Sequence, residues 1–137
     1  MHNRLATLQR CRIGVLTLQS LCRQRERLME IATDVSPHYS LTPRGGTGDD
    51  LIAATVARRQ ALLTDILALE RSVMDDMSAA QRIVLALHSP LLQSVARDYW
   101  LSGMTINDIA AQSGITSNAV SKTKRRVERM LDDAPCA

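Results

Sequence analysis

The feature that most constrains the fold is a helical spacing of apolar residues that continues from Asp50 to Leu87. Small or apolar side chains recur there in steps of three and four at Leu62, Ile66, Leu69, Val73, Ala80, Ile83 and Leu87. This spacing places them along one side of an α-helix. A helix over residues 50–87 would be roughly 55 Å long at 1.5 Å per residue. A helix of that length needs a partner to cover its apolar side.

A second stretch with the same spacing lies near the start of the chain. Its apolar or small residues are Leu8, Cys11, Val15, Leu18, Cys22, Met29 and Ala32. They predict a helix over about residues 4–33, with only Gly14 opposing helix formation. We expect it to end before Ser36 and Pro37, because a proline disfavours helical geometry in the residue ahead of it. The two helices could pair as an antiparallel hairpin in one chain, or two such hairpins could associate as a homodimer.

The predicted loop between these helices, residues 34–49, contains the glycine-rich run RGGTG. A phosphate-binding P-loop would follow a strand and would have a lysine followed by serine or threonine at the start of the next helix. Here Asp49 and Asp50 follow instead, and their charges would repel phosphate. We interpret the run as a connection and the aspartates as residues that complement the positive end of the second helix.

The next part of the chain predicts a shorter helix from Pro90 to Ser102. Ser89 offers a capping hydroxyl, Pro90 suits the first turn, and Gly103 ends the helix. No stretch shows the alternation of β-branched residues that is typical of strands. We therefore predict an all-α chain with a helical hairpin in residues 1–88, a second domain in residues 89–131 and a tail in residues 132–137.

After Gly103 the residue types and their spacing are those of a helix-turn-helix. Thr105 is the predicted N-cap of a helix over Ile106–Ser113, and Gly114 supplies the left-handed backbone conformation of the turn. A second helix follows over about residues 116–131. The small or apolar residues expected to hold the two helices together are Ile109, Ala110, Ile115 and Val120. A helical hairpin without a role in DNA binding would share this apolar pattern.

Positive charge gathers on the second of these helices, although the net charge of the whole chain is only +3. Residues 109–131 contain five basic residues and one acid, a net of +4, whereas residues 45–108 contain five arginines and eight acids, a net of −3. The predicted inward residues are Ala119, Val120, Thr123, Val127, Met130 and Leu131. The side chains left outside are almost all cationic or polar, whereas a solvated helix face normally mixes both signs. The asymmetry predicts a polyanion-binding surface.

We assign candidate DNA contacts from position along this helix. A recognition helix points the side chains of its first turns at base edges, so the candidates for base reading are Ser117, Asn118, Ser121 and Lys122, with Thr116 at the helix start. Residues further along would meet phosphates: Lys124, Arg125, Arg126 and Arg129. Thr105 and Asn107, at the start of the preceding helix, could add phosphate contacts through backbone amides.

These residues also carry a resemblance to known families. The run DYWLSGMTINDIAAQSGITSNAVSKTKRRVERML resembles the promoter-reading C-terminal region of bacterial sigma factors, region 4. Together with the N-terminal helix, the GGTGDD stretch and the long second helix, it resembles the ArpU-like and RinA-like regulators of late phage genes. The resemblance extends from about Arg27 to Leu131, and it is specific in the C-terminal module and looser before it. It implies DNA binding and control of transcription.

The remaining polar residues give no catalytic or metal-binding pattern. His2, His38 and His88 are scattered, and none has a cysteine or carboxylate at ligand spacing. Adjacent aspartates such as Asp75 and Asp76 point away from each other on a helix and do not form a catalytic pair. We therefore predict that the chain is not an enzyme and needs no metal or cofactor.

The cysteine and aromatic content indicates which kinds of binding site and nucleic-acid ligand to expect. The three cysteines, Cys11, Cys22 and Cys136, have no C-x-x-C spacing, which opposes a disulfide framework or a zinc knuckle. Cys11 and Cys22 fall on one helix face and are interpreted as buried small residues, with a cofactor site as the alternative. With aromatic residues at 2% the chain lacks a stacking platform for single strands, so duplex DNA is favoured.

The function expected from these observations is sequence-specific binding of double-stranded DNA by a transcription regulator of phage or prophage origin. The N-terminal helices would form a homodimer or contact RNA polymerase. The alternative is a DNA-packaging protein of the small-terminase type, which also joins a helix-turn-helix to long helices and assembles as a ring. The N-terminus shows no signal peptide and no apolar run is long enough to cross a membrane, so we expect a cytoplasmic, nucleoid-associated protein.

Overall fold

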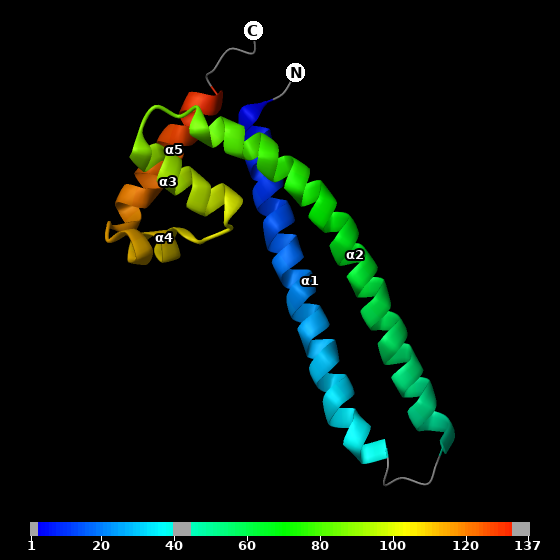
Figure 1. The fold of residues 1–137 in the computed structure, drawn as a ribbon. Helices are drawn as coiled ribbons and strands as arrows, with labels where there is room; N and C mark the ends of the chain where they lie inside the picture. The colour runs from blue at the N-terminus through cyan, green and yellow to red at the C-terminus, as the bar shows by residue number, and fades with distance from the viewer. Residues whose placement is uncertain (1–2, 40–44, 133–137) are drawn as a thin grey trace. The chain divides into compact units, whose positions relative to one another are not determined.

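The structure is a computed structural model that describes residues 3–39 and 45–132 (Figure 1). This part of the chain consists of helices and their connections: α1 (Arg4–Tyr39), α2 (Gly45–Leu85), α3 (Pro90–Ala96), η1 (Arg97–Leu101), α4 (Ile106–Ser113) and α5 (Ser117–Asp132). The predicted all-α class is confirmed for the described residues. The centre of the predicted loop, residues 40–44, and the predicted tail beyond Asp132 lie outside them, as do His2 and Cys136.

The two long helices extend further into the predicted loop than expected. The first ends at Tyr39 instead of about residue 33, and the second begins at Gly45 instead of residue 50 and ends at Leu85. The prediction that α1 stops before Ser36 is wrong, because the restriction that a proline places on the preceding residue is a preference rather than a prohibition. Pro37 lies close to the helix end, and a proline removes only one backbone donor.

The chain divides into two compact units, and the division does not fall at residue 88. The core unit comprises residues 1–16 and 71–137, and the two-helix unit comprises residues 17–70. Both long helices are therefore shared between the units. The first turns of α1 and the last turns of α2 pack with the C-terminal helices, because they contribute buried side chains to the same hydrophobic cluster.

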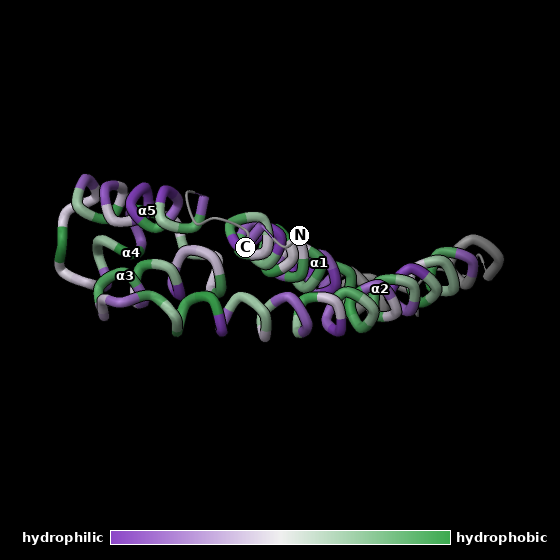
Figure 2. The backbone as a smooth tube through the Cα atoms, turned by 90° about the horizontal axis from the view of Figure 1, so that it is seen from above, coloured by the Kyte–Doolittle hydropathy of each residue, from purple (hydrophilic) through white to green (hydrophobic). Residues whose placement is uncertain are grey.

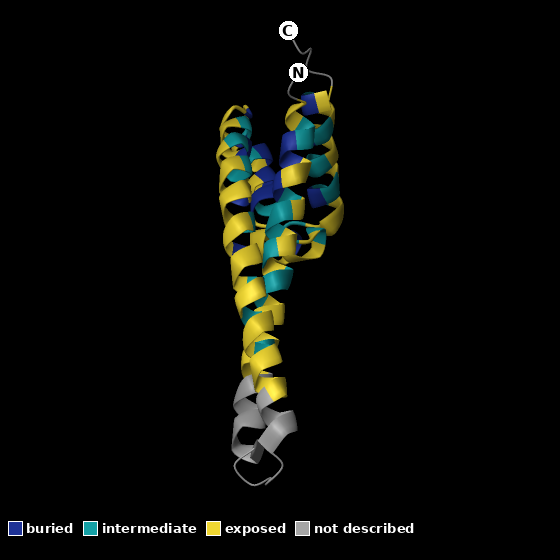
Figure 3. Ribbon diagram, turned by 90° about the vertical axis from the view of Figure 1, so that its right-hand side faces the viewer, coloured by how far each residue is buried: buried dark blue, intermediate teal, exposed yellow. Residues whose placement is uncertain are grey.

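Where the structure describes burial, nearly all of the buried apolar side chains lie in the core unit. One cluster joins both long helices to the C-terminal helices through Leu8, Cys11, Ala80, Val84, Leu87, Leu92, Ala96, Trp100, Leu101, Val127 and Leu131. A second, smaller cluster is built from Val95, Ile109, Ala110 and Val120. Figure 3 shows these buried residues gathered within the core unit. Burial on this scale is the main stabilising contribution to a fold of this kind.

Gly14 has a packing role in the core unit that the sequence did not reveal. A Cβ atom at this position would lie 2.8 Å from Cγ2 of Val73 on α2. Such a contact is far shorter than van der Waals separation, so the absence of a side chain lets α1 approach α2 closely. The glycine costs about 1 kcal/mol of helix propensity relative to alanine, and a larger residue at this position would collide with Val73.

The predicted helix over Pro90–Ser102 is divided into α3 and a single turn of π-helix, η1. Ser102 N–H donates to the carbonyl of Arg97, five residues earlier, at 3.0 Å. Ser89 occupies the N-cap position with an extended backbone, but its side chain makes no capping hydrogen bond, so the predicted capping hydroxyl is wrong. Pro90 already lacks a backbone donor, and the Gln93 N–H is satisfied by the backbone carbonyl of Ser89 at 3.0 Å.

The two-helix unit is packed differently. Among residues 17–30 and 50–70, whose burial the structure describes, Ile66 is the one buried apolar side chain. The predicted stripe residues Leu18, Cys22, Leu62 and Leu69 are half-buried, and Met29 is exposed. Six large apolar side chains are exposed among these same ranges: Met29, Leu51, Ile52, Val56, Leu63 and Leu67.

Candidate nucleic-acid interface

The candidate interface is built on α4, the turn after it, and α5. Thr105 caps α4, because its hydroxyl accepts a hydrogen bond from Asp108 N–H at 3.1 Å. At the other end Gly114 has φ 73° and ψ 17°, the left-handed conformation predicted for the turn, and its N–H donates to the Ala110 carbonyl. The predicted bounds of α4, the N-cap position of Thr105 and the left-handed turn at Gly114 are confirmed.

The start of α5 is fixed by two side-chain hydrogen bonds. The Thr116 hydroxyl accepts from Ala119 N–H at 3.1 Å and so caps the helix. The Ser117 hydroxyl donates to Oδ1 of Asn107 at 2.9 Å, which ties the first turn of α5 to the first turn of α4. Both bonds lie at the exposed surface. Two residues predicted to contact DNA, Asn107 and Ser117, therefore also set the relative position of the two helix starts, and a third, Thr116, caps α5.

The inner side of α5 packs as predicted. Val120 and Val127 are fully buried and Leu131 is 5% exposed, while Ala119, Thr123 and Met130 are half-buried. Ile109 of α4 is fully buried in the same cluster as Val120, Ala110 is 8% exposed, and Ile115 in the turn packs against that cluster. The angle between α4 and α5 is thus held by apolar contacts on the inner side, which leaves the outer side free of packing constraints.

The outer side of α5 carries an exposed cationic stripe. Asn118, Lys122, Arg125 and Arg129 follow steps of four, three and four residues, so they lie on one side of the helix, and Arg126 lies beside them. All five are exposed, and the described residues provide none of the four cations with an ion pair or hydrogen bond. Figure 2 shows the strongly hydrophilic residues recurring along α5. We call Asn118, Lys122, Arg125, Arg126 and Arg129 the outer stripe.

Beyond the first residue of α5, two predicted contact residues on this helix do not belong to the outer stripe. Ser121 is half-buried. Lys124 is also half-buried, with its ammonium 3.2 Å from Oε1 of Glu128 and 4.7 Å from the centre of the Tyr99 ring. That oxygen is inaccessible to solvent and has this ammonium as its counter-charge rather than a hydrogen bond of good geometry. The four-residue spacing of Lys124 and Glu128 would have indicated the pair.

Arg12 of α1 was not predicted to take part in this region, yet it contacts the segment that leads into α4. Its Nη1 atom donates to the Tyr99 carbonyl and, at 3.0 Å, to the Met104 carbonyl. Its guanidinium lies 3.8 Å from the centre of the Tyr99 ring. Nothing in the local sequence could indicate these contacts, because the partners are 87 and 92 residues away.

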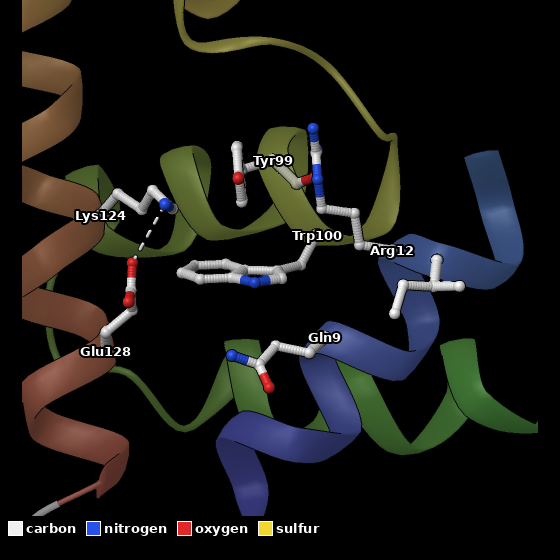
Figure 4. Close-up of a pocket in the computed structure, with 7 residues that line it drawn as sticks. Gln9, Arg12, Tyr99, Trp100, Lys124 and Glu128 are labelled. Carbon is white, nitrogen blue, oxygen red and sulfur yellow. Dashed lines mark hydrogen bonds and ion pairs between the residues drawn. The ribbon is translucent and has the colours of Figure 1, made fainter.

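A pocket of about 250 Å³ lies beside these groups (Figure 4). Arg12, Tyr99, Trp100, Lys124 and Glu128 line it together with Gln9 and Ile13. The rings of Tyr99 and Trp100 meet edge to face, with centroids 5.1 Å apart. The charged groups of the pocket are matched to one another or to backbone carbonyls, so it carries no free charge that would select a ligand.

Cys11 lies within the core of the same unit, as predicted, whereas Cys22 in the two-helix unit is only half-buried. Burial raises the pKa of the Cys11 thiol from its ordinary value of 9.0 to about 11, and the negative charge of Asp76 adds to the effect. A raised pKa keeps the thiol protonated at neutral pH and makes it a poor nucleophile. Among the described residues, no three His, Cys, Asp or Glu side chains are placed to hold a metal ion.

Comparisons of this chain with protein-family models, with curated proteins and with solved structures found no match. None of the described helices has the length and apolarity needed to span a bilayer.

Proposed function

We propose that the protein is a sequence-specific double-stranded DNA-binding regulator of transcription that reads DNA with α5 as the recognition helix of a helix-turn-helix. The observation that carries the proposal is the outer stripe, whose exposed cations the described residues leave unpaired, on a helix whose opposite side is fixed by buried valines. Such a face attracts the phosphates of duplex DNA. A capped, rigidly held helix start is what base reading in the major groove requires.

The proposed division of labour follows the outer stripe. Asn118 and Lys122 lie in the first turns of α5 and would read base edges, whereas Arg125, Arg126 and Arg129 lie further along and would bind phosphates. Lys124 is the weakest of the proposed contacts, because its ammonium is engaged by Glu128 and the Tyr99 ring. The resemblance to sigma region 4 and to the late-gene regulators of phages agrees with this proposal.

The first test is selection of bound fragments from sheared genomic DNA by the purified protein, followed by titration of the selected site at several salt concentrations. Asn118→Ala or Lys122→Ala should lower discrimination at one or two base pairs by ~1 to 3 kcal/mol. Arg126→Ala should weaken binding to every duplex and reduce the salt slope by about 1.

Arg58→Ala is the matched control, since it removes the same charge from an exposed position in the two-helix unit. If it weakens binding as much as Arg126→Ala does, the effect is one of net charge and the outer stripe has no special role. No preference among genomic fragments at moderate salt would exclude sequence-specific regulation.

We also propose that the two-helix unit mediates homodimerisation. Ile52, Val56, Leu63 and Leu67 on α2 follow steps of four, seven and four residues, which places them in one narrow stripe. All four are exposed, at 40 to 53%, whereas on the neighbouring stripe Leu62 and Leu69 are half-buried and Ile66 is buried. A stripe with this repeat is typical of helices that pair with another helix.

Mass in solution tests the dimer and the alternative function together. A mass of two chains, reduced to one chain by Leu63→Asp and Leu67→Asp in combination, supports the dimer. The control is Ala61→Asp with Ala68→Asp, which adds the same charge at exposed alanines of the same helix. A ring of many chains would instead favour a packaging protein of the small-terminase type.

A further inference from the structure

The segment between η1 and α4 is held by α1 at two points. The first is Arg12, whose Nη1 bridges the carbonyls of Tyr99 and Met104 on either side of Gly103. The Tyr99 carbonyl lies near the end of η1, where carbonyls lack a helical partner, and a cationic donor satisfies it well because a helix C-terminus is the negative end of the helix dipole. Figure 4 shows Arg12 reaching from α1 to Tyr99.

The second point is Gly103 itself. Its φ is +74°, and a Cβ atom there would lie 3.2 Å from Cδ2 of Leu16 and 3.3 Å from Cγ1 of Val15. The backbone of Gly103 therefore packs directly beneath the side chains that follow Arg12 on α1. The Met104 N–H in turn donates to the Asp98 carbonyl at 3.0 Å. Hydrogen bonds and close packing together fix the backbone from Tyr99 to Met104.

This segment determines where α4 begins. Met104 directly precedes Thr105, the N-cap of α4, and α4 is tied to the start of α5 through Asn107 and Ser117. A shift of the Met104 carbonyl would therefore displace Thr105, and through it α4 and the first turn of α5. Base reading depends on hydrogen bonds with narrow tolerance in distance and angle, whereas attraction to phosphates tolerates displacement.

We propose that Arg12 is a positioning residue for sequence reading, and that residues 4–16 of α1 belong to the DNA-reading domain rather than to the partner-binding hairpin. The inference rests on the proposed function of α5. Arg12 acts through the backbone of Tyr99 and Met104, because its guanidinium is occupied by two carbonyls and the Tyr99 ring. It should affect specificity and leave phosphate binding unchanged.

The experiment measures the affinity of the full-length protein for the selected site and for a scrambled duplex of equal length, over a range of salt concentrations. For Arg12→Ala we expect the ratio of the two affinities to fall about tenfold, with the affinity for the scrambled duplex and the salt slope unchanged. Arg12→Gln retains one donor and part of the stem, and it should show a smaller loss in the same direction.

Arg10→Ala is the control, because it removes the same charge two residues away on α1 and should leave the ratio unchanged. Fluorescence of Trp100, the only tryptophan of the chain, provides a second readout, since Trp100 and Arg12 line the same pocket. Its emission should shift in Arg12→Ala and stay constant in Arg10→Ala. Circular dichroism is used to check that Arg12→Ala, Arg12→Gln and Arg10→Ala are folded.

The outcomes separate the two proposals. An unchanged ratio in a folded Arg12→Gln or Arg12→Ala variant overturns the positioning role while leaving the proposed function intact. Equal losses on both duplexes with a reduced salt slope also overturn it, since Arg12 would then be a phosphate contact. Absence of duplex binding by the unmodified protein removes the proposed function, and the inference with it.

Discussion

The core unit and the two-helix unit contain similar apolar residues but differ in how much of that apolar surface they bury. In the core unit, leucines and valines from both ends of the sequence enter shared clusters and are almost inaccessible. In the two-helix unit, the described residues of the same types lie along long helices and are half-buried or exposed, apart from Ile66. A single pair of helices has too little thickness to enclose a core. The comparison predicts that the core unit supplies the stability of the monomer and that the two-helix unit depends on a partner.

The largest effect should come from matched leucine substitutions. Leu8 in the core unit is fully buried, and Leu63 in the two-helix unit is 40% exposed. Leu8→Ala should lower the free energy of unfolding by about 3 to 4 kcal/mol, because it removes buried carbon and leaves a cavity. Leu63→Ala should cost less than about 1 kcal/mol at low protein concentration. Urea unfolding followed by circular dichroism measures both.

Protein concentration distinguishes packing within one chain from packing between chains. The cost of Leu63→Ala should grow as the concentration rises, since the dimer would lose a contact that the monomer never had. A cost for Leu63→Ala that equals that of Leu8→Ala at every concentration would contradict the proposed difference between the units.

A buried cysteine in the core unit and a half-buried one in the two-helix unit should differ in how they make stability depend on pH. The pKa of Cys11 is raised to about 11 in the folded protein from an ordinary value of 9.0. Its contribution to stability is therefore complete below about pH 9 and is lost as the pH rises to about 11, a change of about 2 to 3 kcal/mol. Cys11→Ala should remove this part of the pH dependence of unfolding.

Cys22→Ala is the matched control from the two-helix unit. It should leave the fall in stability between pH 9 and pH 11 as it is in the unmodified protein. If Cys11→Ala retains the whole of that fall, other groups are responsible and the Cys11 thiol is not buried as the structure places it.

Substitutions at two glycines of the core unit distinguish the energetic cost of a strained backbone conformation from the cost of steric overlap. Gly103 and Gly114 have nearly the same positive φ, +74° and +73°, but only Gly103 has neighbouring side chains within 4 Å of the position that a Cβ atom would occupy. Gly114→Ala should cost about 1 kcal/mol for the left-handed conformation alone. Gly103→Ala should cost about 2 kcal/mol, because Val15 and Leu16 must also move. Equal costs in thermal unfolding would mean that α1 does not press on this turn.

The parts of this architecture that could be predicted from sequence are those set by short-range rules. The cap at Thr105, the left-handed turn at Gly114 and the buried positions Val120 and Val127 follow from residue type and helical spacing within a few residues. The end of α1 was missed because the restraint imposed by Pro37 is statistical. The outer stripe was predicted from the same spacing, whereas Ser121 and Lys124, which were also predicted to contact DNA, are half-buried.

What could not be predicted depends on contacts between distant parts of the sequence. The boundary between the units passes through the middle of two continuous helices, where no change in composition marks it. The role of Arg12 depends on carbonyls of Tyr99 and Met104, far along the chain. Every residue type has a backbone carbonyl, so the sequence does not indicate which residues a side chain such as Arg12 will bind.

The smallest expected effect concerns the ion pair between Arg10 and Asp76, which links α1 to α2 at the surface of the core unit. The atoms Nε and Oδ1 are 3.5 Å apart, and the Arg10 side chain is 62% exposed. Such a pair contributes at most about 0.5 kcal/mol, and salt reduces it further. Arg10→Ala should therefore change the free energy of unfolding by less than Gly114→Ala does, and the difference from the unmodified protein should vanish in high salt. A loss that exceeds about 1 kcal/mol and persists in high salt would mean that Arg10 acts by packing its stem on the core, which would extend the compact region of α1 to its outer side.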